Sequence, residues 1–333
     1  MRRNWPDIIF SDELSFEEKA RGVFEYQVEQ NPVYRRYCGA LNPEIPEHAE
    51  EYVDTPPLLP IKAFKDAGVT TRSPAEADLV FKSSGTSGMK RSVHYVADSG
   101  IYEQSLLKGF RRFYQLDRSV IWGYTPGYAE NPHSSLIYMI RTLINRDSSG
   151  LSRFLPLEEP LEEDAIREVV ERGKQLILFG AAFGLLDLLE LEETSLPSNS
   201  IVIETGGMKT HRREISRDRL HRRLANGFGL DASRVHSEYG MAELLSQAYA
   251  TGGKWFKTVP WLRVTVRNPD NPAEVLPPYK EGRIGLIDLA NVYSCSFLLT
   301  GDRGVMDRKG RFRVGGRWDP KDLRGCNFLI DED

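Results

Sequence analysis

The chain contains the stretch Ser83-Ser84-Gly85-Thr86-Ser87-Gly88-Met89-Lys90, which follows the short apolar run Leu79-Val80-Phe81. Its glycines allow the backbone to turn tightly and to point successive N–H groups into one concavity. The hydroxyl groups and the lysine add donors that suit a polyphosphate. The stretch therefore predicts a phosphate-binding loop, and a Ser/Gly-rich surface turn is the alternative interpretation. It is not the P-loop of nucleotide hydrolases, whose glycines are spaced further apart than Gly85 and Gly88.

Helices and apolar strands alternate from residue 81 to about residue 255. Strands are expected over 119–124, 175–179, 200–205 and 234–238, and helices over 98–114, 134–144, 161–173, 181–190 and 210–226. This alternation predicts an α/β core with a largely parallel sheet, which would bind a nucleotide if the Ser/Gly loop binds phosphates.

Two regions flank this core. Residues 1–80 are expected to form a helical region packed on the core, with one helix over 16–30 that ends before Asn31-Pro32. Residues 256–333 change to an alternation of period two over 262–266, 285–289 and 311–314. That pattern predicts a mostly antiparallel β subdomain, followed by a truncated hinge and tail. A chain of 333 residues is long enough for one large core with such an appendage.

The composition is ordinary for a globular protein, with 40% hydrophobic and 28% charged residues and a formal net charge of −4. Sequence-independent binding of nucleic acid needs a basic surface, so we expect no nucleic-acid partner. Arginines do gather between residues 212 and 223. Acidic residues and helical spacing intersperse them, which favours a solvated helix face over a nucleic-acid patch.

The cysteines suggest neither a disulfide framework nor a zinc site. Cys38, Cys295 and Cys326 are odd in number and form no C-x-x-C pair. A reducing cytoplasm fits this usage. No apolar signal core follows the first residues, and the apolar stretch 176–191 is interrupted by Asp187 and Glu190. We therefore expect a cytoplasmic protein without stable membrane insertion.

Two clusters follow expected strands of the core. The first is Glu204-Thr205-Gly206-Gly207, where the paired glycines permit a close approach of the backbone to a ligand. The second is Glu238-Tyr239-Gly240-Met241-Ala242-Glu243. Its tyrosine suits stacking on a flat base, and its last glutamate suits a magnesium ion beside phosphates. The alternatives are a plain turn for the first cluster and an acidic helix start for the second.

Two further clusters lie in the β-rich region. Leu299-Thr300-Gly301-Asp302-Arg303-Gly304 places an aspartate in a tight turn after an apolar run, where it is either a turn former or an acceptor for ribose hydroxyls. Gly315-Gly316-Arg317-Trp318-Asp319 offers an arginine as a phosphate or ribose partner. Each cluster is a modest signal when it is taken alone.

The order of these motifs carries more information than any one of them. Ser/Thr/Gly loop, Gly-Gly, Tyr-Gly-x-x-Glu, Thr-Gly-Asp and Gly-Arg-x-Asp follow one another as in the adenylate-forming ligases. The chain resembles that superfamily, and in particular its acyl-protein synthetase branch, the LuxE-type component of the fatty-acid reductase of bacterial luminescence. The stretches 59–65 and 81–88 both look like that branch, which is also related to phenylacetate-CoA ligase-like proteins. The resemblance covers about residues 30 to 330.

This resemblance implies the large-domain fold of an adenylate-forming ligase and the activation of a carboxylic acid, such as a fatty acid, to acyl-AMP. It implies ATP and Mg²⁺ as cofactors and a transfer of the acyl group to a thiol. Roles follow for residues that match the motifs. ATP phosphates would be bound by Ser83, Ser84, Gly85, Thr86, Ser87, Gly88 and Lys90, adenine by Gly206, Gly207 and Tyr239, ribose by Asp302 and Arg317, and Mg²⁺ by Glu243.

The resemblance has one departure. Ligases of this superfamily continue beyond Gly-Arg-x-Asp with a lid domain that carries a lysine, and no residue of this sequence can be given that role. We expect Cys326, beside Arg324, to accept the acyl group as a thioester, with a buried structural cysteine as the alternative. Cys295, on a predicted apolar strand, is expected in the core. His133 is expected either to face the activated carboxyl group or to cap the next helix.

Three functions remain open on the sequence. The first is acyl-protein synthesis, with a reductase or an acyl carrier protein as the final acceptor. The second is a ligase whose acceptor is free coenzyme A. The third is an ATP-binding interaction subunit without turnover, which ATP and Mg²⁺ would stabilise by mass action.

Overall fold

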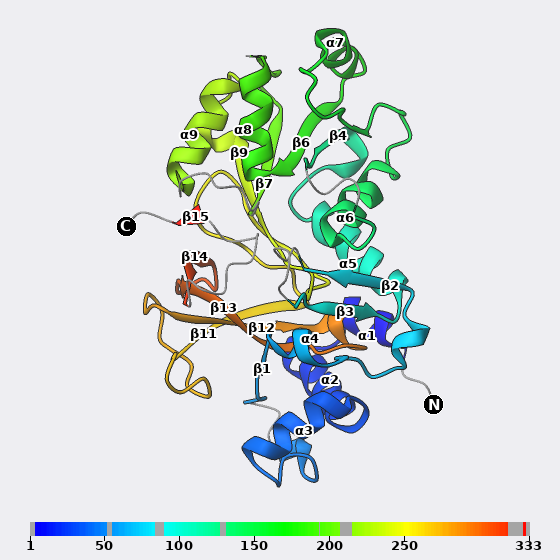
Figure 1. The fold of residues 1–333 in the computed structure, drawn as a ribbon, viewed down its shortest axis with the longest axis vertical. Coiled ribbons are helices and arrows are strands. Elements are labelled where there is room, and N and C mark those ends of the chain that lie inside the picture. Colours follow the sequence, from blue (N-terminus) through cyan, green and yellow to red (C-terminus); the bar gives the residue numbers. More distant parts are fainter. Residues whose placement is uncertain are drawn as a thin grey trace.

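A computed structural model describes residues 4–51, 55–83, 90–126, 131–192, 194–206 and 215–318, together with the backbone of residues 329–330. Figure 1 shows two parts, one above the other. The upper part is a mainly parallel sheet with helices around it, and the lower part is a mostly antiparallel sheet with the N-terminal helices beneath it. The mixed α/β architecture agrees with the fold class expected from the sequence.

The upper part is built on a six-stranded sheet in the order β10-β9-β7-β6-β4-β5. The strands from β9 to β5 are parallel, and β10 pairs antiparallel with β9. Their bounds are β4 Ser119–Tyr124, β5 Arg153–Phe154, β6 Gln175–Ala181, β7 Ile201–Thr205, β9 Val235–Tyr239 and β10 Ala248–Ala250. Strands β4, β6 and β7 are buried on both faces, which explains why they read as continuous apolar runs.

Helices cover both faces of this sheet. One face packs against α5 Ser99–Arg111 and α6 Ser135–Ile144, and the other packs against α7 Glu163–Glu171, α8 Ala182–Leu191 and α9 Arg217–Gly227. Successive side chains on a strand point to opposite faces. On β4, Ile121 accordingly packs in the core that contains α5 and α6, whereas Val120 and Trp122 pack in the core that contains α7, α8 and α9.

The lower part is a five-stranded sheet in the order β1-β13-β12-β11, with β14 also paired to β13. Its strands are β1 Leu59–Pro60, β11 Leu262–Arg267, β12 Gly282–Asp288, β13 Phe297–Met306 and β14 Phe312–Arg317. All neighbours are antiparallel except β1, which pairs parallel with β13. The stretch that contains Pro56, Pro57 and Pro60 therefore supplies an edge strand, β1.

Two short sheets complete the described chain. Strand β2 Leu79–Lys82 pairs antiparallel with β3 Val93–Val96, and β8 Ile215–Ser216 pairs parallel with β15 Leu329–Ile330. The Ser/Gly loop of the sequence joins β2 to β3, so a hairpin presents it.

The N-terminal helices pack on the lower sheet. They are α1 Trp5–Phe10, α2 Phe16–Gln30 and α3 Pro32–Leu41, and a short α4 Ala63–Asp66 follows β1. A capping box formed by Ser15 and Glu18 begins α2. Near its end, the buried Gln27 donates from Nε2 to the carbonyl oxygens of Asn291 and Val292, both at 2.9 Å. These bonds fix the N-terminal region to the turn that precedes β13.

Several elements follow the sequence prediction closely. The helix α2 and the strand β4 have the expected bounds, and Asp98 caps α5 as expected. Two helix starts were predicted wrongly. Ala181 ends strand β6, so α8 begins at Ala182, and Ile215 and Ser216 form strand β8, so α9 begins only at Arg217. Pairing with residues more than a hundred positions away overrides the local helical pattern there.

The prediction for Cys295 was correct on burial and wrong on secondary structure. Cys295 lies in the turn two residues before β13 rather than on a strand, although it is fully buried in the core as expected. His94 and His236 are both buried.

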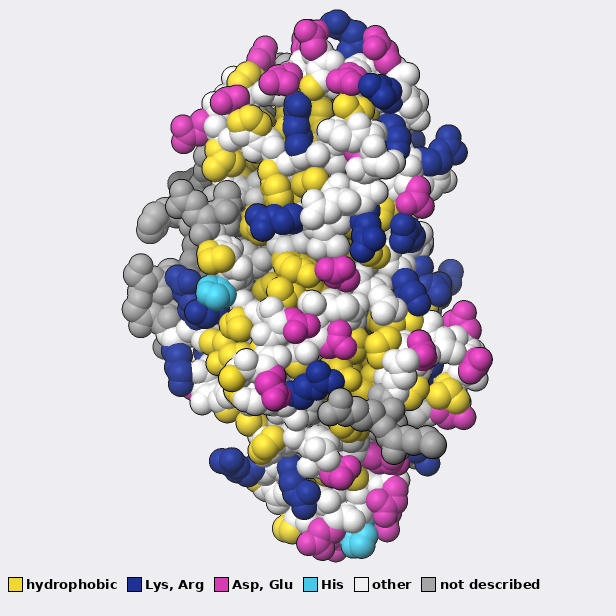
Figure 2. Space-filling model, turned by 90° about the vertical axis from the view of Figure 1, so that its right-hand side faces the viewer, with side chains coloured by type: hydrophobic (Ala, Val, Ile, Leu, Met, Phe, Trp, Pro, Cys, Tyr) yellow, Lys and Arg dark blue, Asp and Glu magenta, His cyan; other side chains and the backbone are white. Residues whose placement is uncertain are grey.

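On the face shown in Figure 2, side chains of Lys and Arg are interspersed with those of Asp and Glu. Among the described residues, no helix is long and apolar enough to cross a membrane.

Candidate functional site

A cleft lies between the upper and lower parts, at the carboxyl ends of β7 and β9. Ligands of open α/β sheets collect at this edge. The cleft is lined from the upper part by the ends of β2, β7 and β9 and the start of α6, and from the lower part by β13 and β14. It brings together residues that are far apart in the sequence and that the motifs had singled out: Ser83, Gly206, Glu243, Asp302 and Arg317.

Only the first and last residues of the Ser/Gly stretch, Ser83 and Lys90, are described, and they lie in different surroundings. Ser83 lines the cleft, and its hydroxyl accepts a hydrogen bond from the backbone N–H of Ser92 at 3.0 Å, which closes the base of the hairpin. Lys90 is exposed and pairs with Asp66 at 3.2 Å. It is not among the residues that line the cleft. The predicted phosphate ligands Ser84, Gly85, Thr86, Ser87 and Gly88 lie outside the described residues.

The carboxylate of Asp302 is held by one hydrogen bond and one ion pair. The buried Tyr239 donates from its hydroxyl to Asp302 Oδ2 at 2.8 Å, and Arg317 Nε lies 3.5 Å from Asp302 Oδ1. The two strands place this pair directly, because Asp302 on β13 is opposite Arg317 on β14. The carboxylate is therefore fixed in the cleft wall, as a ribose contact would require.

The ring of Tyr239 occupies a different place from the one expected. It packs edge-on against Phe256 and Phe312, inside the core, and it does not line the cleft. Burial and the nearby Asp302 raise the pKa of Tyr239 well above its ordinary value, so its hydroxyl stays protonated and serves as a donor. In this arrangement Tyr239 positions Asp302, and its stacking on adenine stays a prediction.

Glu243 lies in a turn that the surrounding structure fixes from two sides. Its carbonyl oxygen accepts a hydrogen bond from Asn291 Nδ2 at 2.9 Å, and the carbonyl of the preceding Ala242 contacts His94 Nδ1 at 2.8 Å. Burial lowers the pKa of His94 to about 4, so the neutral ring donates to that carbonyl. Asp288 holds the following residues by accepting from the backbone N–H groups of Leu245 and Ser246.

A buried polar network lies behind the Gly206 turn. Glu204 accepts hydrogen bonds from Ser237 Oγ and from His221 Nε2, the latter at 3.2 Å, and Arg217 Nε lies 3.5 Å away. Burial opposes ionisation of Glu204, but its hydrogen bond with His221 and the charge of Arg217 outweigh burial and lower its pKa. An ionised carboxylate is thus present beneath the cleft. Gly207, the expected partner of Gly206, lies outside the described residues.

Glu238 is a site residue that the sequence reading had not selected. It is 6% exposed, lines the cleft, and accepts a hydrogen bond from Thr205 Oγ1 at 2.5 Å. Burial raises the pKa of Glu238 to about 7, the negative charge of Glu204 adds to this effect, and the bond from Thr205 opposes it. The only sign of this role in the sequence was the position of an acidic residue on a short predicted strand.

The raised pKa predicts how the stability of the protein depends on pH. The pKa of Glu238 is higher in the folded protein than in the unfolded chain, so protonated Glu238 stabilises the fold. This stabilisation is complete below the unfolded pKa of 4.5 and is lost as the pH rises through about 7. Over this window the loss is about 3 kcal/mol. Glu238→Gln removes the titration, so chemical denaturation should show a variant that gains stability relative to the wild-type protein between pH 5 and pH 8. An unchanged difference across that range would contradict the burial argument.

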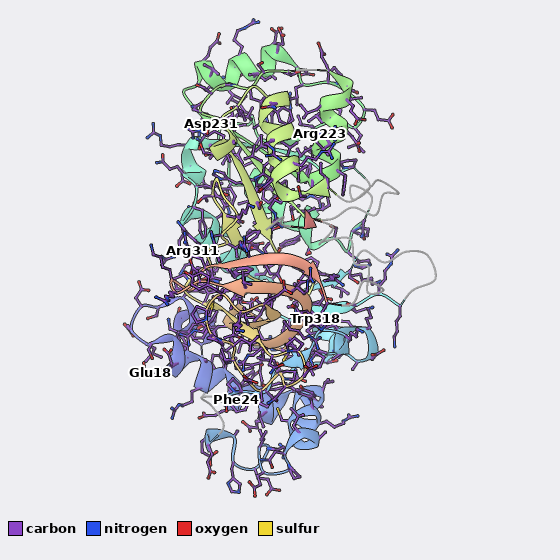
Figure 3. All side chains as sticks on the ribbon, turned by 90° about the vertical axis from the view of Figure 1, so that its left-hand side faces the viewer. Glu18, Phe24, Arg223, Asp231, Arg311 and Trp318 are labelled. Carbon is purple, nitrogen blue, oxygen red and sulfur yellow. The ribbon has the colours of Figure 1, made fainter. Side chains whose placement is uncertain are left out.

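His133, like Lys90, is an expected catalytic residue that does not line the cleft. His133 Nδ1 contacts the carbonyl oxygen of Val80 at 2.9 Å, which ties the segment before α6 to β2, and His133 is not a lining residue. Its neighbours Asn131 and Ser134 do line the cleft, and Ser134, not His133, caps α6. A role of His133 at the substrate carboxyl stays a prediction. Cys326 lies outside the described residues, and the nearest described one before it is Trp318, labelled in Figure 3 at the end of β14.

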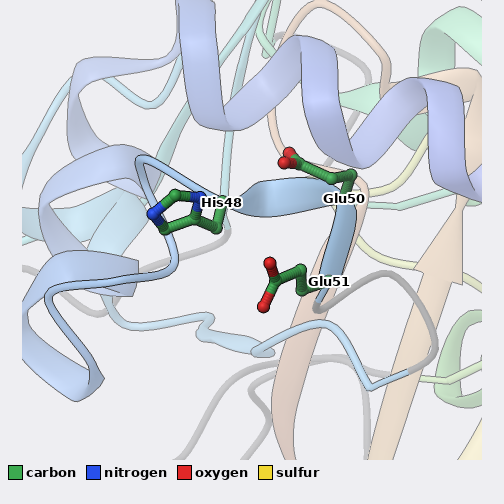
Figure 4. A group of neighbouring side chains, drawn as sticks. All are labelled: His48, Glu50 and Glu51. Carbon is green, nitrogen blue, oxygen red and sulfur yellow. The ribbon is translucent and has the colours of Figure 1, made fainter.

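A second group of polar side chains lies away from the cleft. His48, Glu50 and Glu51, shown in Figure 4, have ligand atoms close enough together to hold a metal ion. All three side chains are exposed, and their spacing follows from a short 3₁₀ turn on the surface. Exposed acidic side chains gather in this way without a ligand, so we assign no function to them.

The comparisons with known proteins identify a family for the chain. The family model "Acyl-protein synthetase, LuxE" matches residues 147–333, which is more than half of the chain. The chain belongs to the acyl-protein synthetase (LuxE) family. This acyl-protein synthetase is 24% identical to a long-chain-fatty-acid–luciferin-component ligase of Vibrio harveyi, over 94% of this chain and 86% of that protein. It is 22% identical to the protein of the same name from Aliivibrio fischeri, over 90% and 84%.

Solved structures with the same fold are adenylate-forming ligases. The acyl-protein synthetase superposes on an open conformation of 2-hydroxyisobutyryl-CoA ligase with a TM-score of 0.63 and 13% identity, over 92% of this chain and 69% of that one. It superposes on ATP-bound MatB from Rhodopseudomonas palustris with a TM-score of 0.52 and 17% identity, over 74% and 49%. The expected superfamily fold is confirmed.

The family membership also confirms the predicted class of activity. The acyl-protein synthetase is a ligase that activates an acyl group with ATP and transfers it to an acceptor. The individual roles of the cleft residues, the metal ion and the acceptor are not decided by this membership.

Proposed function

We propose that the cleft binds ATP and a carboxylic acid together, forms acyl-AMP, and passes the acyl group to a thiol. The observation that carries this proposal is the convergence of Ser83, Gly206, Glu243, Asp302 and Arg317 on one cleft. These residues come from motifs that span more than two hundred positions of the chain. Their order in the sequence and their meeting in space are independent observations, and both point to a nucleotide site.

The chemistry required is an attack of the substrate carboxylate on the α-phosphorus of ATP. A bond forms between a carboxylate oxygen and that phosphorus, the bond to the bridging oxygen of pyrophosphate breaks, and pyrophosphate leaves with the electron pair. The charge that builds on the phosphoryl oxygens is best stabilised by fixed donors. Ser83 would supply one such donor in the cleft, and Asp302 with Arg317 would hold the ribose.

Magnesium fits the donors that the cleft offers. Mg²⁺ is usually held by one or two carboxylates together with substrate phosphates. Glu243 is a cleft carboxylate whose backbone is fixed by Asn291 and by the His94–Ala242 contact. When bound there, the ion would neutralise charge on the phosphates, and the role of Glu243 would be to orient it.

The names of the curated relatives, long-chain-fatty-acid–luciferin-component ligases, support a long-chain fatty acid as the acid. Because the family is that of acyl-protein synthetases, we favour an acyl-accepting protein over free coenzyme A. We place the reaction in the cytoplasm, where ATP and reduced thiols are both available.

The test is acid-dependent exchange between ATP and labelled pyrophosphate, over a panel of fatty and aryl acids. Exchange with one or more acids is expected from the purified chain. A chain that binds ATP, as judged by a shift in melting temperature with ATP and Mg²⁺, yet exchanges pyrophosphate with no acid would be the interaction subunit instead.

A further inference from the structure

The described cleft has two walls of different chemistry. On the side of the lower sheet, Asp302 and Arg317 form a polar wall. On the other side the lining is aromatic and aliphatic, with Tyr102 from α5 and Met139 from α6. An adenylate-forming cleft must hold a charged nucleotide and an acyl chain, so the second wall suits the acyl chain.

Glu238 belongs to the second wall. Neighbouring residues of a strand point to opposite faces, and Tyr239 points towards Asp302 and the lower sheet. Glu238 points the other way, towards α5, where the buried phenol of Tyr102 lies. Burial raises the pKa of that phenol, and the nearby charge of Glu238 raises it further. The side chain is therefore on the side of the cleft away from the predicted ribose contact.

Among the described residues, only one oxygen of the Glu238 carboxyl has a hydrogen-bond partner. Oε2 accepts from Thr205, and the described residues supply no hydrogen bond to Oε1. Oε1 lies against Gly240, where a Cβ would stand only 2.3 Å from it. Gly240 thus leaves room for the carboxyl in a position where any larger residue would displace it. Oε1 is not fully buried, and it reaches the cleft that Glu238 lines. A plain alkyl chain bound against Oε1 would remove its water without replacing the hydrogen bond, which costs free energy.

We propose that Glu238 selects a carboxylic acid whose chain carries a hydroxyl group, which hydrogen-bonds to Glu238 Oε1 in the cleft. The inference rests on the proposed function and names the class of its acid substrate. A hydroxyl group suits this position because it can donate to a carboxylate and accept from a carboxylic acid. The hydrogen bond therefore forms whether Glu238 is protonated or ionised. An ammonium group can only donate, so it would need the ionised form of Glu238.

The experiment compares acids in matched pairs. Acid-dependent ATP–pyrophosphate exchange is measured with fatty acids of equal length, unsubstituted or hydroxylated at the 2, 3 or terminal position. For the wild-type protein, kcat/KM should favour one hydroxylated acid over its unsubstituted partner about 10-fold or more. Glu238→Leu should abolish or reverse that preference, and Glu238→Gln should retain part of it. Asp307→Asn, which removes a buried carboxylate outside the cleft, should leave it unchanged.

The outcomes separate this inference from the function on which it rests. Exchange with no acid at all would overturn the proposed function. Exchange that favours the unsubstituted acids in the wild-type protein would overturn the role of Glu238 alone, even if Glu238→Leu fails to fold. A Glu238→Gln variant that raises KM for ATP while the ratio between acids stays constant would show that Glu238 contacts the nucleotide, which also overturns the inference.

Discussion

Replacing Glu243 by Gln is expected to lower the turnover of acid-dependent ATP–pyrophosphate exchange about 100-fold or more. Three carboxyl groups are found among the described residues that line the cleft, those of Glu238, Glu243 and Asp302. Asp302 already accepts from Tyr239 and faces Arg317. Glu238 has a pKa raised to about 7 by burial, which makes it a poor ligand for a cation at neutral pH. Glu243 is therefore the carboxylate best suited to orient Mg²⁺.

The measurement is a series of exchange rates at increasing Mg²⁺ concentration. Glu243→Gln keeps the size of the side chain and removes its charge, so the fold should be preserved while the concentration of Mg²⁺ needed for half-maximal exchange rises. Glu243→Asp should recover part of the rate, since it restores the charge at a shorter reach. Rates for Glu243→Gln within about threefold of the wild-type protein at every Mg²⁺ concentration would remove Glu243 from the site.

The parts of the fold that were predictable are those that local pattern determines. The apolar spacing of residues 16–30, with a Pro directly after Asn31, defined α2, and the uninterrupted apolar run 119–124 defined β4. The pairing of β8 with β15 was not predictable, because two residues carry no periodicity and the partner lies at the far end of the chain. The pairing of β1 with β13 was not predictable for the same reason.

The sequence likewise predicted some residues of the site and missed others. Motif order led to Glu243, Asp302 and Arg317, and the fold brings all three to one cleft. The orientation of Tyr239 depends on which face of β9 it occupies, and that face is decided by tertiary packing against Phe256 and Phe312. Glu238 was missed for a related reason. Its importance comes from burial beside Thr205 and Glu204, and the sequence contains no sign of that burial apart from the strand itself.

The identity of the acyl acceptor can be narrowed by considering the cysteines of the chain. A thiol must ionise to act as a nucleophile, and burial opposes this. Burial raises the pKa of Cys38 to about 12 and raises that of Cys295 as well. Both thiols are 0% exposed and belong to the core of the lower part, which makes them unsuited to receive an acyl group. The remaining cysteine of the sequence is Cys326.

The described residues on either side of Cys326 suit this role. Arg317 lines the cleft, and the next residue, Trp318, donates its backbone N–H to the carbonyl of Gly301, another lining residue, at 2.9 Å. After Cys326 the backbone returns at Leu329 and Ile330 to pair with β8. The segment that carries Cys326 thus begins at the cleft, and Arg324 in the same segment would favour a thiolate.

We therefore predict that incubation with ATP, Mg²⁺ and the preferred acid adds one acyl mass to the chain, on Cys326. The thiolate would attack the carbonyl carbon of acyl-AMP, a thioester would form, and AMP would leave. Intact-mass spectrometry should show an adduct that hydroxylamine removes and that Cys326→Ser abolishes completely. Pyrophosphate exchange should be largely retained in that variant, because adenylation precedes the transfer. Cys38→Ser and Cys295→Ser serve as matched controls and should keep the adduct. An adduct that survives Cys326→Ser, or that peptide mapping places on Cys38 or Cys295, would refute the assignment.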